Sequence, residues 1–218
     1  MQIAIALYPG FTALDAIGPY QVLGHVPGAE VVLCAERPGR ITDDNGLLHV
    51  QVDHALADVA RPDVVLVPGG PGTRRLAADG GPLVDWVRAA HATTTWTTSV
   101  CTGALILGAA RLLDGLDATT HWFAYDQLRA YGARPTEQRV VVHEDHRIAT
   151  AAGVSAGIDL ALVLAGRLAG DEVAQAIQLG IEYDPQPPFD AGAPSKAPAG
   201  IRDLVAAVMA EAEAAALA

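Results

Sequence analysis

The chain has 218 residues, of which 51% are hydrophobic and 18% are charged, and its 14 Lys and Arg against 25 Asp and Glu give a formal net charge of −11. This apolar content is sufficient for a folded core and excludes a mainly disordered chain. The acidic balance argues against a nucleic-acid partner, because phosphate binding requires clustered Lys and Arg. Two cysteines, Cys34 and Cys101, are too few for a disulfide framework or a zinc site.

The start of the chain and its most apolar stretch favour a cytoplasmic protein. Residues 1–11 lack the basic region that begins a signal peptide. Residues 154–170 are interrupted by Asp159 and Arg167, so they fall short of the roughly 20 apolar residues that cross a bilayer. We therefore expect a soluble protein with no membrane partner.

The first half of the chain alternates strand-length apolar runs with helical patterns. The expected strands and helices are, in chain order, strand 2–8, helix 14–24, strands 29–36, 47–52 and 63–67, helix 83–92, strand 94–100 and helix 102–113. The strand at 63–67 is rich in β-branched residues and stops at the glycine-rich turn 68–72. Strands separated by helices at this spacing predict parallel βαβ units, and hence an α/β sandwich around a buried sheet.

The second half reads as one hairpin followed by helices. Two apolar runs flank an acidic turn at Glu144 and Asp145, which predicts a β-hairpin over 138–150. The expected helices are 154–168, 171–181 and 201–217. Residues 184–200 are rich in Pro and Gly but too apolar for a free linker, so we expect an ordered arm that leads to the C-terminal helix. The whole chain, 1–218, is expected to form a single domain.

The strongest chemical signal is the segment Ser-Val-Cys-Thr-Gly at 99–103, between an expected strand and an expected helix. A small residue, a nucleophile and a glycine at a strand-to-helix turn form a nucleophile elbow, here with Cys101 in place of the usual serine. A thiol at a helix N-terminus is also expected to have a lowered pKa. The alternative is that Cys101 is a small buried apolar residue, a description that suits Cys34 well.

Two backbone N–H groups are expected to face the nucleophile and stabilise polar intermediates. One belongs to Thr102, the residue after Cys101, and the other to Gly70 in the glycine-rich turn. Neighbouring parallel strands end at the same edge of a sheet, which would bring these two turns together. Taken alone, the turn at 68–72 could equally be an ordinary connection.

Other polar residues at this edge have two readings. Asp15 follows the first strand and is either an acid that faces Cys101 or the N-cap of the next helix. His121 is the best placed of the seven histidines for a Cys-His pair, although a structural role beside Trp122 is more usual. His143 and His146 lie at the expected hairpin tip, which we interpret as a solvated turn and not a metal site.

Several motifs together make the chain similar to a known family. The segments that carry the likeness are LDAIGP at 14–19, VPGGPG at 67–72, TSVCTGALILGAARLLDG at 98–115, ATTHW at 118–122, AGIDLAL at 156–162 and IQLGIEYDPQPPFDAGAP at 177–194. They resemble the ThiJ/PfpI superfamily and, within it, the isonitrile hydratase branch. The resemblance implies a flavodoxin-like three-layer sandwich, usually a homodimer, with Cys101 as nucleophile and Asp15 as the acid facing it.

The resemblance also implies the chemistry. The Cys101 thiolate would add to the terminal carbon of a small-molecule isonitrile while Asp15 protonates that carbon, and water would convert the thioimidate to an N-substituted formamide, with no metal or organic cofactor. Peptidase-like members often carry His directly after the Cys, where this chain has Thr102. Two alternatives stay open, a glyoxalase-like or deglycase-like enzyme of the same superfamily and a ligand-sensing domain similar to those of AraC-type regulators.

Overall fold

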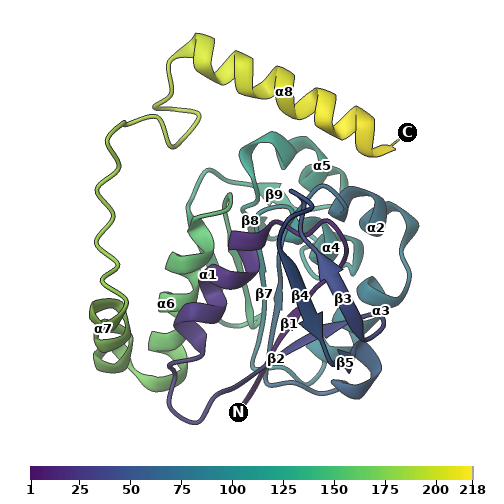
Figure 1. Cartoon of the computed structure of the whole chain (residues 1–218), viewed down its shortest axis with the longest axis vertical. Helices are drawn as coiled ribbons and strands as arrows, with labels where there is room; N and C mark the ends of the chain where they lie inside the picture. Colours follow the sequence, from purple (N-terminus) through teal and green to yellow (C-terminus); the bar gives the residue numbers. More distant parts are fainter. Residues whose placement is uncertain (218) are drawn as a thin grey trace.

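The protein is built on a seven-stranded sheet, as seen in a computed structural model that describes the backbone of residues 1–217 and the side chains of residues 1–211 (Figure 1). The strand order is β10-β11-β7-β6-β1-β2-β5, and every neighbouring pair is parallel except β10 and β11. The strands are β1 (Gln2–Ala6), β2 (Glu30–Ala35), β5 (His54–Ala55), β6 (Val64–Val67), β7 (Trp96–Val100), β10 (Val140–His143) and β11 (Ile148–Ala151). The antiparallel pair confirms the predicted hairpin.

Helices cover both faces of this sheet, which confirms the predicted α/β sandwich (Figure 1). They are α1 (Ala13–Leu23), α2 (Thr73–Asp79), α3 (Pro82–His91), α4 (Gly103–Ala109), α5 (Tyr125–Ala130), α6 (Ala156–Ala169), α7 (Asp171–Gly180) and α8 (Ala199–Leu217), with short 3-10 helices η1 (Leu56–Asp58) and η2 (Trp122–Ala124). Helices α1 and α6 pack against each other, as do α3 and α4. A side chain at Gly18 would meet Ile158 Cγ1 at 3.0 Å, so this glycine lets α1 approach α6 closely.

The strand predicted at 47–52 belongs to a different sheet from the one expected. It is present as β4 (His49–Val52), which pairs antiparallel with β3 (Gly39–Thr42) outside the central sheet. Only Val52 of this strand is fully buried, and a strand with one face in solvent suits a hairpin better than a buried parallel sheet. A second small sheet pairs β8 (Asp117–Ala118) with β9 (Arg134–Pro135).

Helix α4 is shorter than the sequence pattern predicted. It ends at Ala109, although apolar helical spacing continues to Leu113. The Leu112 N–H reaches back to the Leu107 carbonyl at 3.1 Å, and Arg111 takes a left-handed conformation with φ +65°. This hydrogen-bond pattern closes a helix and turns the chain away.

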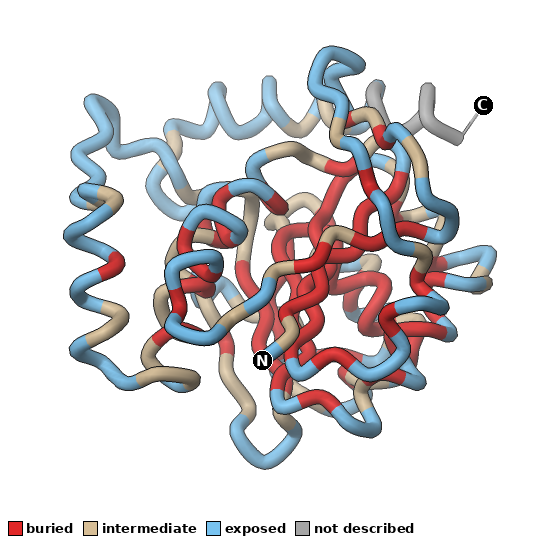
Figure 2. Tube along the Cα trace, turned by 60° about the horizontal axis from the view of Figure 1, so that its bottom comes forward, coloured by how far each residue is buried: buried red, intermediate tan, exposed pale blue. Residues whose placement is uncertain are grey.

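The C-terminal part leaves the compact body and returns over it. After α7 the chain runs without helix or strand along one side of the molecule to α8, which lies across the end where the site is found (Figure 1). Both the connection and residues 199–211 of α8 are largely exposed (Figure 2). In the part of the chain that the structure describes, no helix is both long and apolar enough to span a membrane.

The strand order determines where side chains converge. From β1 the chain moves to β2 on one side and then returns to β6 on the other side. Open α/β sheets form a crevice at such a switch point, outside the carboxyl ends of the strands. The segments that follow β1, β6 and β7 therefore meet at one edge.

Candidate active site

Cys101 occupies a strand-to-helix elbow between β7 and α4. It has φ +55°, an uncommon left-handed conformation for a residue with a side chain. Its N–H donates to the carbonyls of Ala151 at 3.1 Å and Ala152 at 2.9 Å, which ties the elbow to the end of β11. A Cβ at Gly103 would lie 2.2 Å from the Val67 carbonyl oxygen, so the turn requires glycine there.

Asp15 lies in the first turn of α1 and is completely buried. Its Oδ2 accepts a hydrogen bond from the Gly69 N–H at 2.8 Å, and Oδ1 has no partner among the described nitrogen and oxygen atoms. The N-cap position belongs to Thr12. The alternative that Asp15 caps this helix is therefore wrong, since its carboxyl points across the sheet edge to the turn after β6.

Gly69 shows how close the carboxyl and the thiol-bearing residue lie. A Cβ placed on Gly69 would be 2.7 Å from Asp15 Oδ2 and 2.8 Å from Cys101 Cβ. Both side chains thus occupy the space that any larger residue would need. Glycine at this position of the turn therefore allows the carboxyl of Asp15 and the thiol of Cys101 to lie close together.

The buried position determines the proton affinity of both groups. Burial raises the pKa of Asp15 from 3.8 to about 7, although hydrogen bonds from Gly69 and Cys101 act in the opposite direction. Burial also raises the pKa of the Cys101 thiol well above its ordinary value, and the negative charge of Asp15 adds to this effect. The expected lowering of the thiol pKa is wrong, because desolvation and a neighbouring carboxylate outweigh the N-terminus of the seven-residue helix α4.

Two backbone N–H groups partly offset the cost of a negative charge on Cys101. They belong to Thr102 and Val154, and hydrogen bonds from both lower the thiol pKa. The Thr102 group was predicted, whereas the Gly70 N–H instead donates to the Thr102 hydroxyl at 2.9 Å. Val154 takes the place expected for Gly70. Nothing in the local sequence marks Val154, which the pairing of β11 with β7 brings close to the thiol.

Thr102 and Gly70 together stiffen the turn beneath the thiol. The Thr102 hydroxyl both accepts from the Gly70 N–H and lies 3.2 Å from the Gly70 carbonyl oxygen. Gly70 has φ +147°, and a Cβ there would lie 2.3 Å from the Gly10 carbonyl oxygen. The loops after β6 and β1 therefore approach each other too closely for a side chain at Gly70.

A cavity of about 360 Å³ opens above Cys101. Its wall includes the polar residues Thr12, Asp44 and Arg74 and the apolar residues Phe123 and Met209. Met209 comes from α8, so the C-terminal helix contributes to the roof of a site formed mainly by the sheet edge. The volume suits a small organic molecule.

His121 lines this cavity but is not protonated near neutral pH. Burial and the positive charge of Arg74 lower its pKa to about 4. Its Nδ1 accepts from the Phe123 N–H at 3.3 Å, which assigns the ring proton to Nε2. A charged Cys-His pair therefore does not form, and the acidic partner of Cys101 is Asp15.

The second cysteine has none of these features. Cys34 lies within β2, and its Sγ is 3.7 Å from the Ile5 carbonyl oxygen. Burial raises its pKa to about 12, and no other titratable group contributes. Cys34 therefore behaves as a core residue.

The sheet, its switch point and the cysteine elbow define a class of flavodoxin-like α/β proteins. The model of the DJ-1/PfpI family matches residues 1–166, and the chain belongs to this family. It is 43% identical over 203 residues to the isonitrile hydratase of Pseudomonas putida. The aligned region covers 93% of this chain and 87% of that protein. It is also 30% identical over 174 residues to the HTH-type transcriptional regulator CdhR of Pseudomonas aeruginosa, covering 77% of this chain and 51% of the regulator.

Solved structures agree with this assignment. A ThiJ/PfpI family protein from Pseudomonas syringae superposes with a TM-score of 0.91 at 38% identity, covering 99% of this chain and 88% of that one. Drosophila melanogaster DJ-1beta superposes with a TM-score of 0.74 at 22% identity, covering 83% and 97% of the two chains, and shares the fold.

Proposed function

We propose that the protein is an isonitrile hydratase, which adds water to an isonitrile and gives an N-substituted formamide. The observation that carries this proposal is the buried acid–thiol pair of Asp15 and Cys101 below a cavity of small-molecule size. Similarity to the Pseudomonas putida enzyme over nearly the whole chain supports it and favours it over the regulator, which is matched over half its length.

The first step is proton transfer within the pair. Ionised Asp15 takes the proton of the Cys101 thiol as the substrate enters, and the thiolate adds to the terminal carbon of R–N≡C. The same carboxyl then delivers its proton to that carbon. The product is a thioimidate, R–N=CH–S–Cys101, and Asp15 is again ionised.

Water completes the reaction. It adds to the thioimidate carbon while Asp15 relays a proton to nitrogen, which gives R–NH–CH(OH)–S–Cys101. Departure of the thiolate, with return of a proton to the pair, releases R–NH–CHO. The N–H groups of Thr102 and Val154 stabilise the sulfur when it carries negative charge. Asp15 and Cys101 relay the protons and water supplies both hydrogens added to the product, so the scheme needs no cofactor or metal.

The decisive experiment compares two substrates on one preparation. Purified protein is given p-nitrophenyl isocyanide or methylglyoxal, and formamide formation and methylglyoxal loss are followed side by side. We expect formamide from the first substrate and no comparable turnover of the second. Faster turnover of methylglyoxal would favour the glyoxalase-like alternative and overturn the proposal.

We propose further that the enzyme works as a cytoplasmic homodimer of single-domain subunits and does not bind nucleic acid. The net charge of −11 supports the last point, because it opposes association with phosphates. Exposed apolar side chains on α8, including Leu204 and Val208, provide surface that a second subunit would cover.

A further inference from the structure

The Val154 N–H reaches the thiol from a short connection under backbone strain. Residues 152–155 join β11 to α6, and within them Val154 has φ +21°, which is unusual for a β-branched residue. Such a conformation persists only where surrounding contacts impose it. The contacts on either side of Val154 therefore decide whether its N–H faces Cys101.

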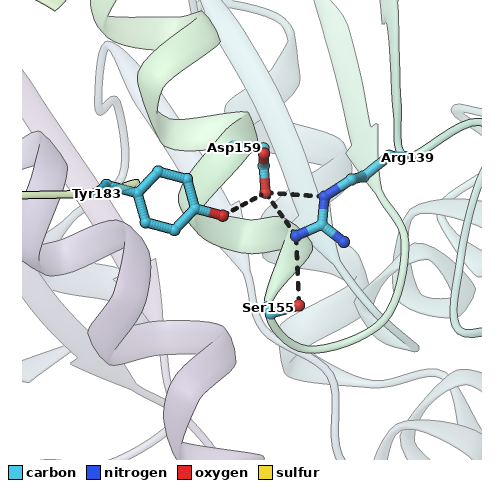
Figure 3. Close-up of polar contacts among 4 residues, drawn as sticks. All are labelled: Arg139, Ser155, Asp159 and Tyr183. Atoms are coloured by element: carbon cyan, nitrogen blue, oxygen red, sulfur yellow. Dashed lines mark hydrogen bonds and ion pairs between the residues drawn. The ribbon is translucent and has the colours of Figure 1, made fainter. Parts of the chain in front are cut away.

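Arg139, just before β10, supplies contacts on both sides of Val154, and Figure 3 shows those that its side chain makes with Ser155 and Asp159. Its carbonyl oxygen accepts the Ala152 N–H at 2.9 Å. Its guanidinium donates to Ser155 Oγ at 3.2 Å, and through Nε and Nη2 to Asp159 Oδ2 at 2.9 and 2.6 Å. One residue thus holds the start of the connection through its backbone and the first turn of α6 through its side chain.

We propose that Arg139 is a positioning residue for the hydration reaction, because it holds residues 152–155 so that the Val154 N–H faces the Cys101 sulfur. This inference rests on the proposed function for its kinetic part. Arg139 does not touch the reacting atoms, and its guanidinium is about half exposed, so the ion pair with Asp159 adds little to global stability. Its effect is local, on the direction of one hydrogen bond.

Helix α6, which Arg139 contacts through Asp159, also carries a matched control. Arg167, in the last turn of α6, pairs with Glu144 at the far end of the β10–β11 hairpin, and its side chain is 48% exposed against 49% for Arg139. Both arginines therefore tie α6 to the same hairpin. Only the Arg139 end adjoins the thiol.

The test follows the reactivity of the thiol by itself. Alkylation of Cys101 by iodoacetamide is measured against pH by peptide mass spectrometry in the full-length protein and in Arg139→Gln and Arg167→Gln. The titratable and charged groups around the thiol and its cavity are Asp15, Tyr8, His121, Arg74 and Asp44, and all are unchanged in these variants, as are Val154 and Thr102. In Arg139→Gln the profile should move to higher pH by about one unit, which is a roughly tenfold slower reaction on its rising part.

Turnover adds a second readout. For Arg139→Gln we expect kcat for p-nitrophenyl isocyanide to fall roughly tenfold with KM within about twofold, the pattern of a lost transition-state contact. Arg167→Gln should match the wild type in both measurements. Arg139→Lys keeps the charge but not the fork of donors, and should fall between them.

Two results would overturn the inference. One is an Arg139→Gln alkylation profile that coincides with that of Arg167→Gln. The other concerns Ser155→Ala, which removes only one contact of Arg139 and replaces Arg139→Gln as the test if that variant does not fold. An alkylation profile of Ser155→Ala that matches the wild type would also contradict the role of Arg139. A wild-type protein that makes no formamide would refute the proposed function, while the alkylation comparison would still stand.

Discussion

Asp15 and Cys101 lie together in a site with little water, where the negative charge of one disfavours ionisation of the other. With the pKa of Asp15 near 7 and that of the thiol higher still, the pair holds one proton on sulfur above neutrality and two protons below it. In the proposed mechanism the form with one proton starts the reaction, because the carboxylate first accepts the thiol proton.

The two cysteines should therefore respond very differently to substitution. Cys101→Ala is expected to abolish isonitrile turnover and to leave the fold intact, since the elbow backbone does not depend on sulfur. Cys34→Ala should change activity little. Formamide production and circular dichroism of both variants check this, and substantial activity in Cys101→Ala protein would end the nucleophile assignment.

The role of Asp15 predicts a rate loss and a pH dependence. Because an amide cannot transfer the proton, Asp15→Asn should lose at least roughly 10²-fold in rate. For the wild type, kcat/KM should rise with pH through about 7 as Asp15 ionises and then level. Turnover measured between pH 5 and 9 checks both points. Asp15→Glu should keep partial activity if the site accepts the longer side chain.

Thermal stability separates this role from a structural one. The raised pKa means that the folded protein holds the Asp15 proton more tightly than the unfolded chain does. The contribution of Asp15 to stability is therefore complete below about pH 4 and is lost as pH rises to about 7. Asp15→Asn escapes this decline. Its melting temperature relative to the wild type should therefore increase over that interval, and a constant difference would contradict a buried titrating acid.

At the scale of the elements, α8 reaches a site that the sheet edge otherwise forms. Met209 lines the cavity, so Met209→Ala should enlarge it and favour bulkier isonitriles. We expect the ratio of kcat/KM for an aryl isonitrile to that for a small alkyl isonitrile to rise several-fold. Leu179→Ala, at an exposed residue of α7 that does not line the cavity, serves as the control. An unchanged ratio would remove α8 from the substrate cavity.

Six of the seven strands of the central sheet could be predicted, because apolar runs and helical spacing agree with the tertiary structure there; the two-residue edge strand β5 was not predicted. The elbow at Cys101 followed from its place after a strand, whereas the choice of Asp15 as the acid came from the family resemblance. What failed depended on packing between distant segments. Residues 49–52 carry a strand pattern but no signal for their partner β3, and α4 stops at a hydrogen-bond closure that apolar spacing conceals.

The site was harder to predict where it depends on burial and on long-range contacts. A helix N-terminus alone predicts a lowered pKa for the Cys101 thiol. In the structure, burial and the carboxyl of Asp15, 86 residues away in sequence, raise this pKa instead. Val154 contributes through its backbone N–H, which any residue possesses. Residue identity therefore could not reveal it.

For the whole molecule we expect a homodimer without affinity for DNA. Light scattering at micromolar concentration should give twice the chain mass of 22.5 kDa. A duplex of random sequence should show no salt-sensitive binding in fluorescence anisotropy. A monomer would contradict the first expectation, and tight binding that weakens with salt would revive the ligand-sensing alternative.

The buried, protonated state of Cys101 also bears on how the protein withstands oxidants. Peroxides attack thiolates, and the cysteines that act as redox sensors are exposed and have low pKa values. Cys101 is the opposite in both respects, since it is buried and holds its proton tightly. If, as proposed, this sulfur ionises only when the Asp15 carboxylate takes its proton, it should persist unoxidised in the resting protein, which would preserve the proposed nucleophile between turnovers.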